Sequence, residues 1–265
     1  MAHKTLIGGT IYEISGGKTL VGGTAYSIKN GKTLVGGTAY EVGFKREGVS
    51  STGEILDDWT TISSAKNIGL YSVGNYKPIT LTDTGETVIM EIVALNADTK
   101  SNGGTAHITW ISRTLIDNAY MNNTNTNENG WYACALRAYL QSDIYNILPS
   151  ELRNVIVSVN KTYYDRTSKS TKTCVDNVWI PSYREIFGNS DGNSKYETSG
   201  VDYTSFFTSA TKIKKTFSDG SVYTWWLRTA VSTLTTAFYN VKTSGSGTSS
   251  SSTNYPSGVA LGFCT

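Results

Sequence analysis

Residues that could carry out covalent chemistry are few in this chain of 265 residues. Its only histidines are His3 and His107. A serine or cysteine nucleophile needs a base beside it. His107 lies in the segment Ala106–Ile111, which alternates like a strand, so we interpret it as a packed core histidine. Nucleophilic catalysis is therefore not expected.

Metal and redox chemistry also lack a ligand pattern. The three cysteines, Cys134, Cys174 and Cys264, have no metal spacing, and their odd number argues against a disulfide framework. Residues 189–193 read Asn-Ser-Asp-Gly-Asn, which has the composition of a calcium loop without the spaced acidic ligands and distal glutamate of an EF-hand. We expect a plain loop there, and neither a metal nor another cofactor.

Carboxylate pairs are the remaining catalytic option. A glycosidase needs two acidic side chains roughly 5–10 Å apart, and the chain has 21 aspartates and glutamates. No acidic pair stands out in a segment rich in tyrosine and tryptophan. A glycan-degrading enzyme is therefore an alternative, and non-covalent binding is the favoured function.

The segment best suited to binding is 229–265, which contains 16 serines and threonines and a single charged side chain. It follows the rigid run 224–228 and ends in the apolar run 258–263. Short polar residues with tyrosines are typical of antibody paratopes, because tyrosine supplies contact area at low entropic cost. A disordered linker is the alternative, but a linker would not precede a final core segment. The candidate ligand-binding residues are the apolar anchors Val231 and Leu234, with Thr233, Thr236, Ala237, Tyr239, Lys242, Ser246, Thr248, Ser249, Ser250, Ser251, Tyr255 and Pro256.

The elements that must position this tract lie in residues 58–265, where strand and helix patterns are mixed and predict an α+β fold. Residues 88–95 are apolar and β-branched, so we expect a buried central strand with 106–111 as its neighbour. Further strands are expected at 155–164 and 238–241. At least one of Trp225 and Trp226 should be buried beneath the binding surface.

Helices are expected at 113–121, 130–148 and 150–156, with a short one after Ser182. In the second of these, Trp131, Ala135, Ala138, Ile144 and Leu148 fall near one stripe, and Pro149 ends the helix. Ser182 and Glu185 have the spacing of a capping box, which marks the start of the last helix.

Residues 4–44 repeat with a period of 14 residues. Each unit begins with Lys-Thr-Leu and has a Gly-Gly pair between two short β-branched runs, which predicts a hairpin. One short hairpin buries too little surface to be stable alone. The repeats must therefore pack on each other, on the main domain or on further copies, as a small meander or as a stalk or attachment segment, for which a homotrimer is one arrangement. Residues 45–57 read as the linker.

Charge and hydropathy exclude other classes. A net charge of +2 provides no field to attract nucleic acid. No run approaches the roughly 18 apolar residues that a spanning helix needs, so membrane insertion is not expected. The first residues lack the apolar stretch of a signal peptide, and we expect synthesis in a reducing bacterial cytoplasm.

Several short motifs, in this order and spacing, resemble a domain family common in gut bacteria and their phages. The pair that carries the resemblance is Trp225-Trp-Leu-Arg228 followed by Gly258-Val-Ala-Leu-Gly-Phe263, and the resemblance spans about 55–265. The upstream matches are Asp58-Trp59, Val73-Gly74 before Lys77, Gly130-Trp131 before Leu136-Arg137, Leu148-Pro149 before Glu151-Leu152, and Ile180-Pro181-Ser182 before Glu185.

This resemblance implies a C-type-lectin-like fold, in the branch shared with formylglycine-generating enzymes. The cysteines do not match a formylglycine site, so that chemistry is not carried over. Some relatives resemble variable proteins of diversity-generating retroelements, and the Gly-Gly-Thr repeats are similar to those of phage tail and fibre proteins. The chain departs from the pattern at Thr229-Ala230 and Leu261, and it has Thr, Ser, Ala, Leu and Tyr where relatives carry asparagines. Mutagenesis directed at the adenines of Asn codons would produce such replacements.

The function implied is a phage or prophage receptor-binding adhesin, carried on the virion or the cell surface. Its diversified region, 225–265, would bind a bacterial surface protein or glycan, and its N-terminal repeats would bind a phage structural protein. The alternatives are a glycan-degrading enzyme of a phage particle and a purely structural particle or cell-surface protein.

Overall fold

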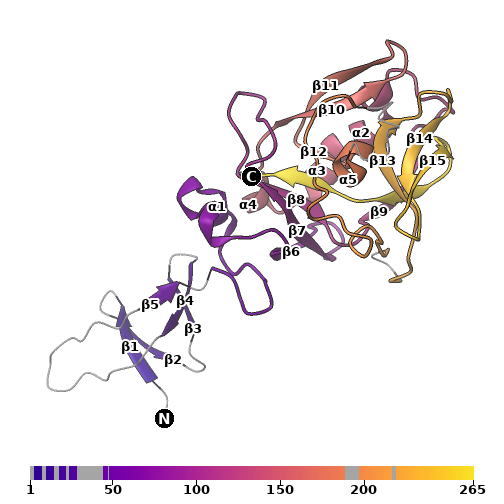
Figure 1. Cartoon of the computed structure of the whole chain (residues 1–265). Helices are drawn as coiled ribbons and strands as arrows, with labels where there is room; N and C mark the ends of the chain where they lie inside the picture. Colours follow the sequence, from indigo (N-terminus) through magenta and orange to yellow (C-terminus); the bar gives the residue numbers. More distant parts are fainter. Residues whose placement is uncertain are drawn as a thin grey trace, which may run out of the picture. The chain divides into compact units, whose positions relative to one another are not determined.

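The structure is a computed structural model that describes residues 3–7, 10–14, 18–21, 24–28, 44–46, 48–188, 197–216 and 219–265. The chain divides into two compact units, Met1–Tyr71 and Ser72–Thr265 (Figure 1). Helices and mixed sheets both occur, which confirms the α+β class.

The first two N-terminal repeats form hairpins, as predicted. Strand β1 (His3–Ile7) pairs with β2 (Thr10–Ile14), and β3 (Lys18–Val21) pairs with β4 (Thr24–Ile28), both antiparallel. Strand β5 (Phe44–Arg46) adds to β4 and makes a three-stranded sheet. The third repeat, 32–42, lies outside the described residues.

The segment predicted as a linker, 45–57, contains an ordered turn from residue 48 onwards. A bridge between Val49 and Ile55 closes the turn, and the Tyr71 hydroxyl donates a hydrogen bond of 2.7 Å to the buried Asp57 carboxylate. Helix α1 (Trp59–Ser63) and the 3₁₀ helix η1 (Ala65–Leu70) follow. Asp58 caps α1 by accepting from the Thr61 N–H at 2.7 Å.

The first sheet of the second unit has the strand order β12-β17-β8-β7-β6. Its strands are β6 (Tyr76–Thr80), β7 (Thr87–Leu95), β8 (Ile108–Ser112), β12 (Val178–Trp179) and β17 (Gly262–Cys264). The predicted pairing of 88–95 with 106–111 is confirmed as β7 and β8. His107 precedes β8 and is only half-buried, which corrects its placement in the core. The final apolar segment returns to the core, where Phe263 stacks on Trp110 with ring centroids 6.2 Å apart.

The second sheet has the order β15-β14-β13-β16-β9. It contains β9 (Asp117–Ala119), β13 (Trp225–Ala230), β14 (Ala237–Val241), β15 (Gly247–Ser252) and β16 (Ser257–Val259). Trp225 and Trp226 are both fully buried. The prediction of a helix over 113–121 is wrong, because backbone groups of this segment form hydrogen bonds with another strand. The Ile116 N–H donates to the Val259 carbonyl, and β9 pairs with β16.

The predicted helix over 130–148 forms, but its winding changes along its length. The segments are η2 (Gly130–Ala133, 3₁₀), α2 (Ala135–Tyr139), η3 (Leu140–Ile144, π) and α3 (Tyr145–Ile147). The extended backbone of Cys134 interrupts the helix between η2 and α2 and shifts the phase of the buried face, so Ala138 is exposed rather than in the stripe. The buried residues are Trp131, Cys134, Leu136, Leu140, Ile144 and Leu148.

Two helices and one hairpin complete the second unit. Helix α4 (Ser150–Arg153) is shorter than predicted, and the hairpin of β10 (Val159–Asp165) and β11 (Ser170–Asp176) follows. Helix α5 (Tyr183–Phe187) begins with the predicted capping box, in which the Ser182 hydroxyl accepts from the Glu185 N–H and the Glu185 carboxylate accepts from the Ser182 N–H.

Candidate functional site

The predicted ligand-binding residues fall into two groups, one at the open end of the β14–β15 hairpin and one at its turn. Thr233, Leu234 and Thr236 lie in the loop before β14, and the loop after β15 contains Tyr255 and Pro256. Lys242 and Ser246 lie in the turn between the strands, where the Lys242 N–H donates to the Ser246 carbonyl at 2.8 Å. A five-residue strand spans about 17 Å, so the two groups do not form one continuous surface.

Three of the predicted residues are buried, which corrects their assignment to an exposed surface. Val231, Ala237 and Tyr239 have exposed fractions of 1%, 2% and 6%. Val231 and Ala237 close the loop before β14 through a backbone hydrogen bond of 3.0 Å. The Tyr239 ring packs edge-on against Tyr183, with centroids 5.1 Å apart. These side chains therefore support the surface from below.

Residues 248–251 form most of strand β15, the terminal strand in the order of its sheet. The predicted ligand contacts of Thr248, Ser249, Ser250 and Ser251 depend on side chains that lie outside what the structure describes. They stay a prediction.

One buried side chain fixes the loop before β14. The amide nitrogen of Asn127 lies 3.1, 2.8 and 2.7 Å from the carbonyl oxygens of Val231, Leu234 and Ala237, to which it donates. The Asn127 side-chain oxygen accepts from Arg166 Nε at 2.9 Å. Asn127 is completely buried, so its amide supplies the hydrogen bonds that water would otherwise make to the carbonyls of this loop. Sequence reasoning missed Asn127, because no local pattern shows which asparagine of this segment faces inward.

The loop after β15 is held in the same way by Thr253. Its N–H donates to the Thr236 carbonyl at 2.9 Å, and its own carbonyl accepts from Met121 and Asn122 at 3.1 and 3.2 Å. The Thr253 hydroxyl donates to the Thr124 carbonyl at 3.1 Å. The three loops 121–126, 231–236 and 253–256 are therefore one connected structure.

Exposed side chains on these loops make up what we call the loop surface. Tyr255 and Leu234 have exposed fractions of 67% and 42%. Tyr120, 53% exposed, joins them because its neighbour Ala119 pairs with Ser257. Sequence reasoning missed Tyr120, since it placed this residue on a helix. The loop surface comprises Tyr120, Asn123, Thr124, Asn125, Thr233, Leu234, Thr235, Thr236, Asn254, Tyr255 and Pro256, none of which is charged.

A network of ion pairs is buried inside the Ser72–Thr265 unit. Arg228, on β13, contacts both carboxylate oxygens of Glu185, on α5, at 2.7 and 2.6 Å. Lys161 Nζ lies 2.7 Å from Glu185 and 2.7 Å from Asp98. Tyr203 donates a hydrogen bond of 2.7 Å to Asp98. We call Asp98, Lys161, Glu185, Tyr203 and Arg228 the buried centre.

The electrostatics of the buried centre keep its carboxylates ionised. Burial by itself opposes ionisation of Glu185, but Arg228 and Lys161 outweigh it and hold the pKa of this carboxyl below its usual value. For Asp98, burial is likewise outweighed by Lys161, and the pKa is lowered. Neither residue can therefore supply a proton as a general acid near neutral pH, so this pair does not favour the glycosidase alternative.

The cysteines are free, buried thiols. Burial is the largest influence on Cys174 and, with the nearby Asp176 carboxylate, raises its pKa to about 12. A thiolate nucleophile is therefore not formed there at neutral pH.

Motif residues that carry the resemblance lie in the framework and not on the loop surface. Glu185 and Arg228 pair in the buried centre. Asp176, at the end of β11, accepts from Trp131 Nε1 at 2.8 Å and from Arg137 Nε at 2.7 Å. Charge pairing inside the domain accounts for these motif positions.

Comparison with known proteins assigns the chain to a family. Residues 105–264 match a family described as a domain of unknown function (DUF6273), and because this is more than half of the chain, the protein belongs to that family. Neither the curated proteins nor the solved structures contain a match. Among the described residues, no helix is long and apolar enough to cross a membrane, and no group of three or more His, Cys, Asp or Glu side chains could hold a metal ion.

Proposed function

We propose that this protein is a phage or prophage receptor-binding adhesin, in which a C-type-lectin-like domain binds a bacterial surface protein or glycan without covalent chemistry. The loop surface is the binding site, and the N-terminal repeats attach the domain to a phage structural protein. The protein would be made in the bacterial cytoplasm and carried on the virion or the cell surface.

The observation that carries the proposal is the way Asn127 and Thr253 hold the loops. Both residues bond to backbone carbonyl or N–H groups of the loops they support, so the exposed side chains of 233–236 and 254–256 are free to vary while the backbone stays in place. Tyrosines, asparagines and short hydroxyl residues on such a scaffold have the composition of a paratope. Both motif tryptophans are buried, on opposite faces of β13, which fixes the strand that leads into the loop before β14.

Diversification of the tract is part of this proposal. The resemblance implies that Thr233-Leu234, Thr236-Ala237, Tyr239 and the Ser/Thr run stand where relatives carry asparagines, and the resemblance to retroelement variable proteins extends over the loop surface. Sequencing the DNA beside the coding region tests this. A near-identical template repeat next to a reverse-transcriptase gene is expected, and the absence of both would remove diversification from the proposal.

Binding to host cells tests the adhesin function directly. The purified full chain should sediment with host bacteria and release no reducing sugar from their surface polysaccharide. Tyr255→Ala and Tyr120→Ala should each lower cell binding at least fivefold, because aromatic side chains dominate such contacts. Lys66→Ala, on a surface outside the loops, is the matched control. Release of reducing ends would instead favour the enzyme, and unchanged binding in both tyrosine variants would exclude the loop surface as the site.

Attachment through the repeats has its own test. Light scattering of the full chain and of a chain lacking residues 1–44 should show a homotrimer in the first case and a monomer in the second. An unchanged number of chains would contradict assembly through the repeats.

A further inference from the structure

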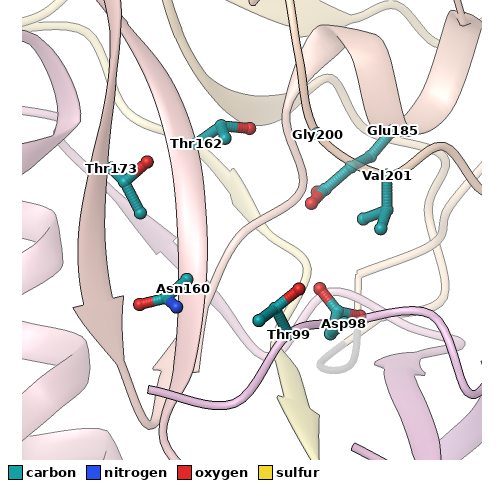
Figure 2. Close-up of a pocket in the computed structure, with 8 residues that line it drawn as sticks. All are labelled: Asp98, Thr99, Asn160, Thr162, Thr173, Glu185, Gly200 and Val201. Carbon is teal, nitrogen blue, oxygen red and sulfur yellow. The ribbon is translucent and has the colours of Figure 1, made fainter. Parts of the chain in front are cut away.

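A concave site lies in the Ser72–Thr265 unit, next to the buried centre. It is a pocket of about 370 Å³, within the range of small-molecule sites. Figure 2 shows Asn160 and Thr162 on one strand and Thr173 on the neighbouring strand, with Glu185 and Val201 across the space. The lining residues are Asp98, Thr99, Asn160, Thr162, Thr173, Glu185, Gly200 and Val201.

The charged part of this lining is already compensated. Asp98 and Glu185 border the pocket, but Lys161 lies 2.7 Å from each of them, and Arg228 binds Glu185 through both of its oxygens. Two carboxylates therefore face two cations. A ligand that depends on a net charge finds no uncompensated partner among the described lining residues.

The neutral part of the lining has unused hydrogen-bonding capacity. The hydroxyls of Thr99, Thr162 and Thr173 have no hydrogen-bond partner among the described residues, and the Asn160 amide makes only a long contact of 3.4 Å with the Lys100 carbonyl. Hydroxyl and amide groups each both donate and accept. Four such groups around one space match a molecule with several hydroxyls of its own.

The wall opposite β10 is fixed before any ligand arrives. Gly200 has φ +114°, a conformation that favours glycine, and a Cβ at this position would lie 2.4 Å from Thr162 Oγ1. Arg184 Nε donates to the Gly200 carbonyl at 2.9 Å, and the Thr198 N–H donates to Thr171 Oγ1 at 2.8 Å. The pocket is thus preformed, which lowers the ordering cost of binding.

We propose that this pocket binds a small neutral molecule with several hydroxyl groups, of about the size of a monosaccharide. Thr99, Asn160, Thr162 and Thr173 would exchange hydrogen bonds with the ligand hydroxyls, and the buried centre would hold the wall that carries Glu185. The site is separate from the loop surface, because Thr162, the lining residue of β10 nearest to Arg166, stands about 13 Å from it along the strand direction, and Arg166 contacts Asn127 on the loop-surface side. The proposal therefore goes beyond the adhesin function and does not depend on it.

Ligand-observed NMR on the full chain tests the proposal with four probes: glucose, N-acetylglucosamine, the cation glucosamine and the anion glucuronate. The two neutral sugars should bind, and the charged ones should bind more weakly. Thr173→Val removes one hydroxyl from an exposed strand position and should weaken binding about fivefold, the worth of one hydrogen bond. Val201→Trp should abolish binding by filling the pocket. Thr80→Val, the same change at an exposed position of β6, is the matched control and should have no effect.

The outcomes separate the proposal from its alternatives. No binding of either neutral sugar at the highest soluble concentrations would overturn it. Binding of glucosamine without the neutral sugars would also overturn it, because the carboxylates would then be the anchors. If the sugars bind but Thr173→Val and Val201→Trp have no effect, they bind elsewhere and the proposal fails. Should Val201→Trp not fold, Thr173→Val against Thr80→Val still decides the question.

Discussion

The buried centre and the loop surface are opposite in chemistry. Ionised residues, which usually lie at the surface of a protein, are here enclosed in the core, as Lys161, Glu185 and Arg228 show. The loop surface, which is open to solvent, has no charged residue. A buried ion pair tolerates almost no single substitution, since the partner left behind has no counter-charge. Uncharged loop residues on a fixed backbone tolerate many substitutions. The side chains that restrict substitution therefore lie in the core, and those that permit it lie on the loop surface.

Breaking the buried centre should have the largest effect. Arg228→Ala leaves Glu185 ionised and poorly compensated in the core, and we expect a loss of about 3–5 kcal/mol in the free energy of unfolding. Thermal denaturation of the variant and the unchanged protein measures this loss. Arg113→Ala, which breaks the exposed pair with Glu91 at 2.9 Å, is the control and should cost about 0–1 kcal/mol. Equal losses in the two variants would contradict the contrast between buried and exposed charge.

Glu197 should make stability depend on pH. It is buried, one oxygen accepts from the Thr229 hydroxyl at 2.7 Å, and the other has no partner among the described residues. Burial is the main reason why its pKa rises from 4.5 to about 7, and the nearby Arg228 only partly offsets it. The folded state therefore holds this proton more tightly than the unfolded state, and stability falls as the pH rises from 4.5 to about 7.

This pH dependence is worth about 3 kcal/mol at most, from 1.36 kcal/mol per pKa unit. Denaturation at pH 5 and pH 7.5 measures it. Glu197→Gln, which stays neutral, should remove most of the difference, while Glu128→Gln at an exposed position should leave it unchanged. A difference that persists in Glu197→Gln would assign the pH dependence to other groups.

Removing the support of the loop surface should have an intermediate effect. Asn127→Ala deprives the carbonyls of Val231, Leu234 and Ala237 of their shared donor, and we expect a loss of about 1–3 kcal/mol. Hydrogen exchange of the 231–237 amides should rise more than that of β7. The exposed Asn123→Ala is the control. If exchange rises equally in both variants, Asn127 does not hold the loop.

Changing the loop surface itself should have the smallest effect on the fold. Tyr255→Ala and Leu234→Ala should each change the free energy of unfolding by less than about 0.5 kcal/mol, as melting curves can show. Tyr239→Ala should cost several times more, because its ring fills the core against Tyr183. A large loss in Tyr255→Ala would instead mark this residue as part of the core.

The sequence predicted those elements whose signal is local. The β-branched run of β7, the capping box at Ser182 and Glu185, and the Gly-Gly repeats each depend on neighbouring residues, and the structure confirms the strand, the cap and the first two hairpins. Elements that depend on distant partners were missed. Within 113–121, residues 117–119 form β9 because β16 lies beside them.

The same limit applies to the candidate site. Leu234 and Tyr255 are exposed as predicted, but Val231 and Tyr239 are not. Val231 closes the loop before β14, and β14 is buried along its whole length, so both of its faces are covered. Asn127, Tyr120 and the pocket beside β10 depend on contacts between segments far apart in the chain. No residue pattern within one segment could have revealed them.

The position of β17 has a consequence for biosynthesis. This strand follows the serine- and threonine-rich tract in the chain, yet it lies between β12 and β8 in the first sheet, pairing Phe263 with both Val178 and Trp110. A ribosome must therefore read through the whole tract before the centre of that sheet can close. A stop codon or frameshift within the tract removes β17, so β12 loses its strand neighbour and β8 keeps only β7, and core residues of both strands become exposed. Substitutions within the tract that keep the reading frame leave this pairing strand intact.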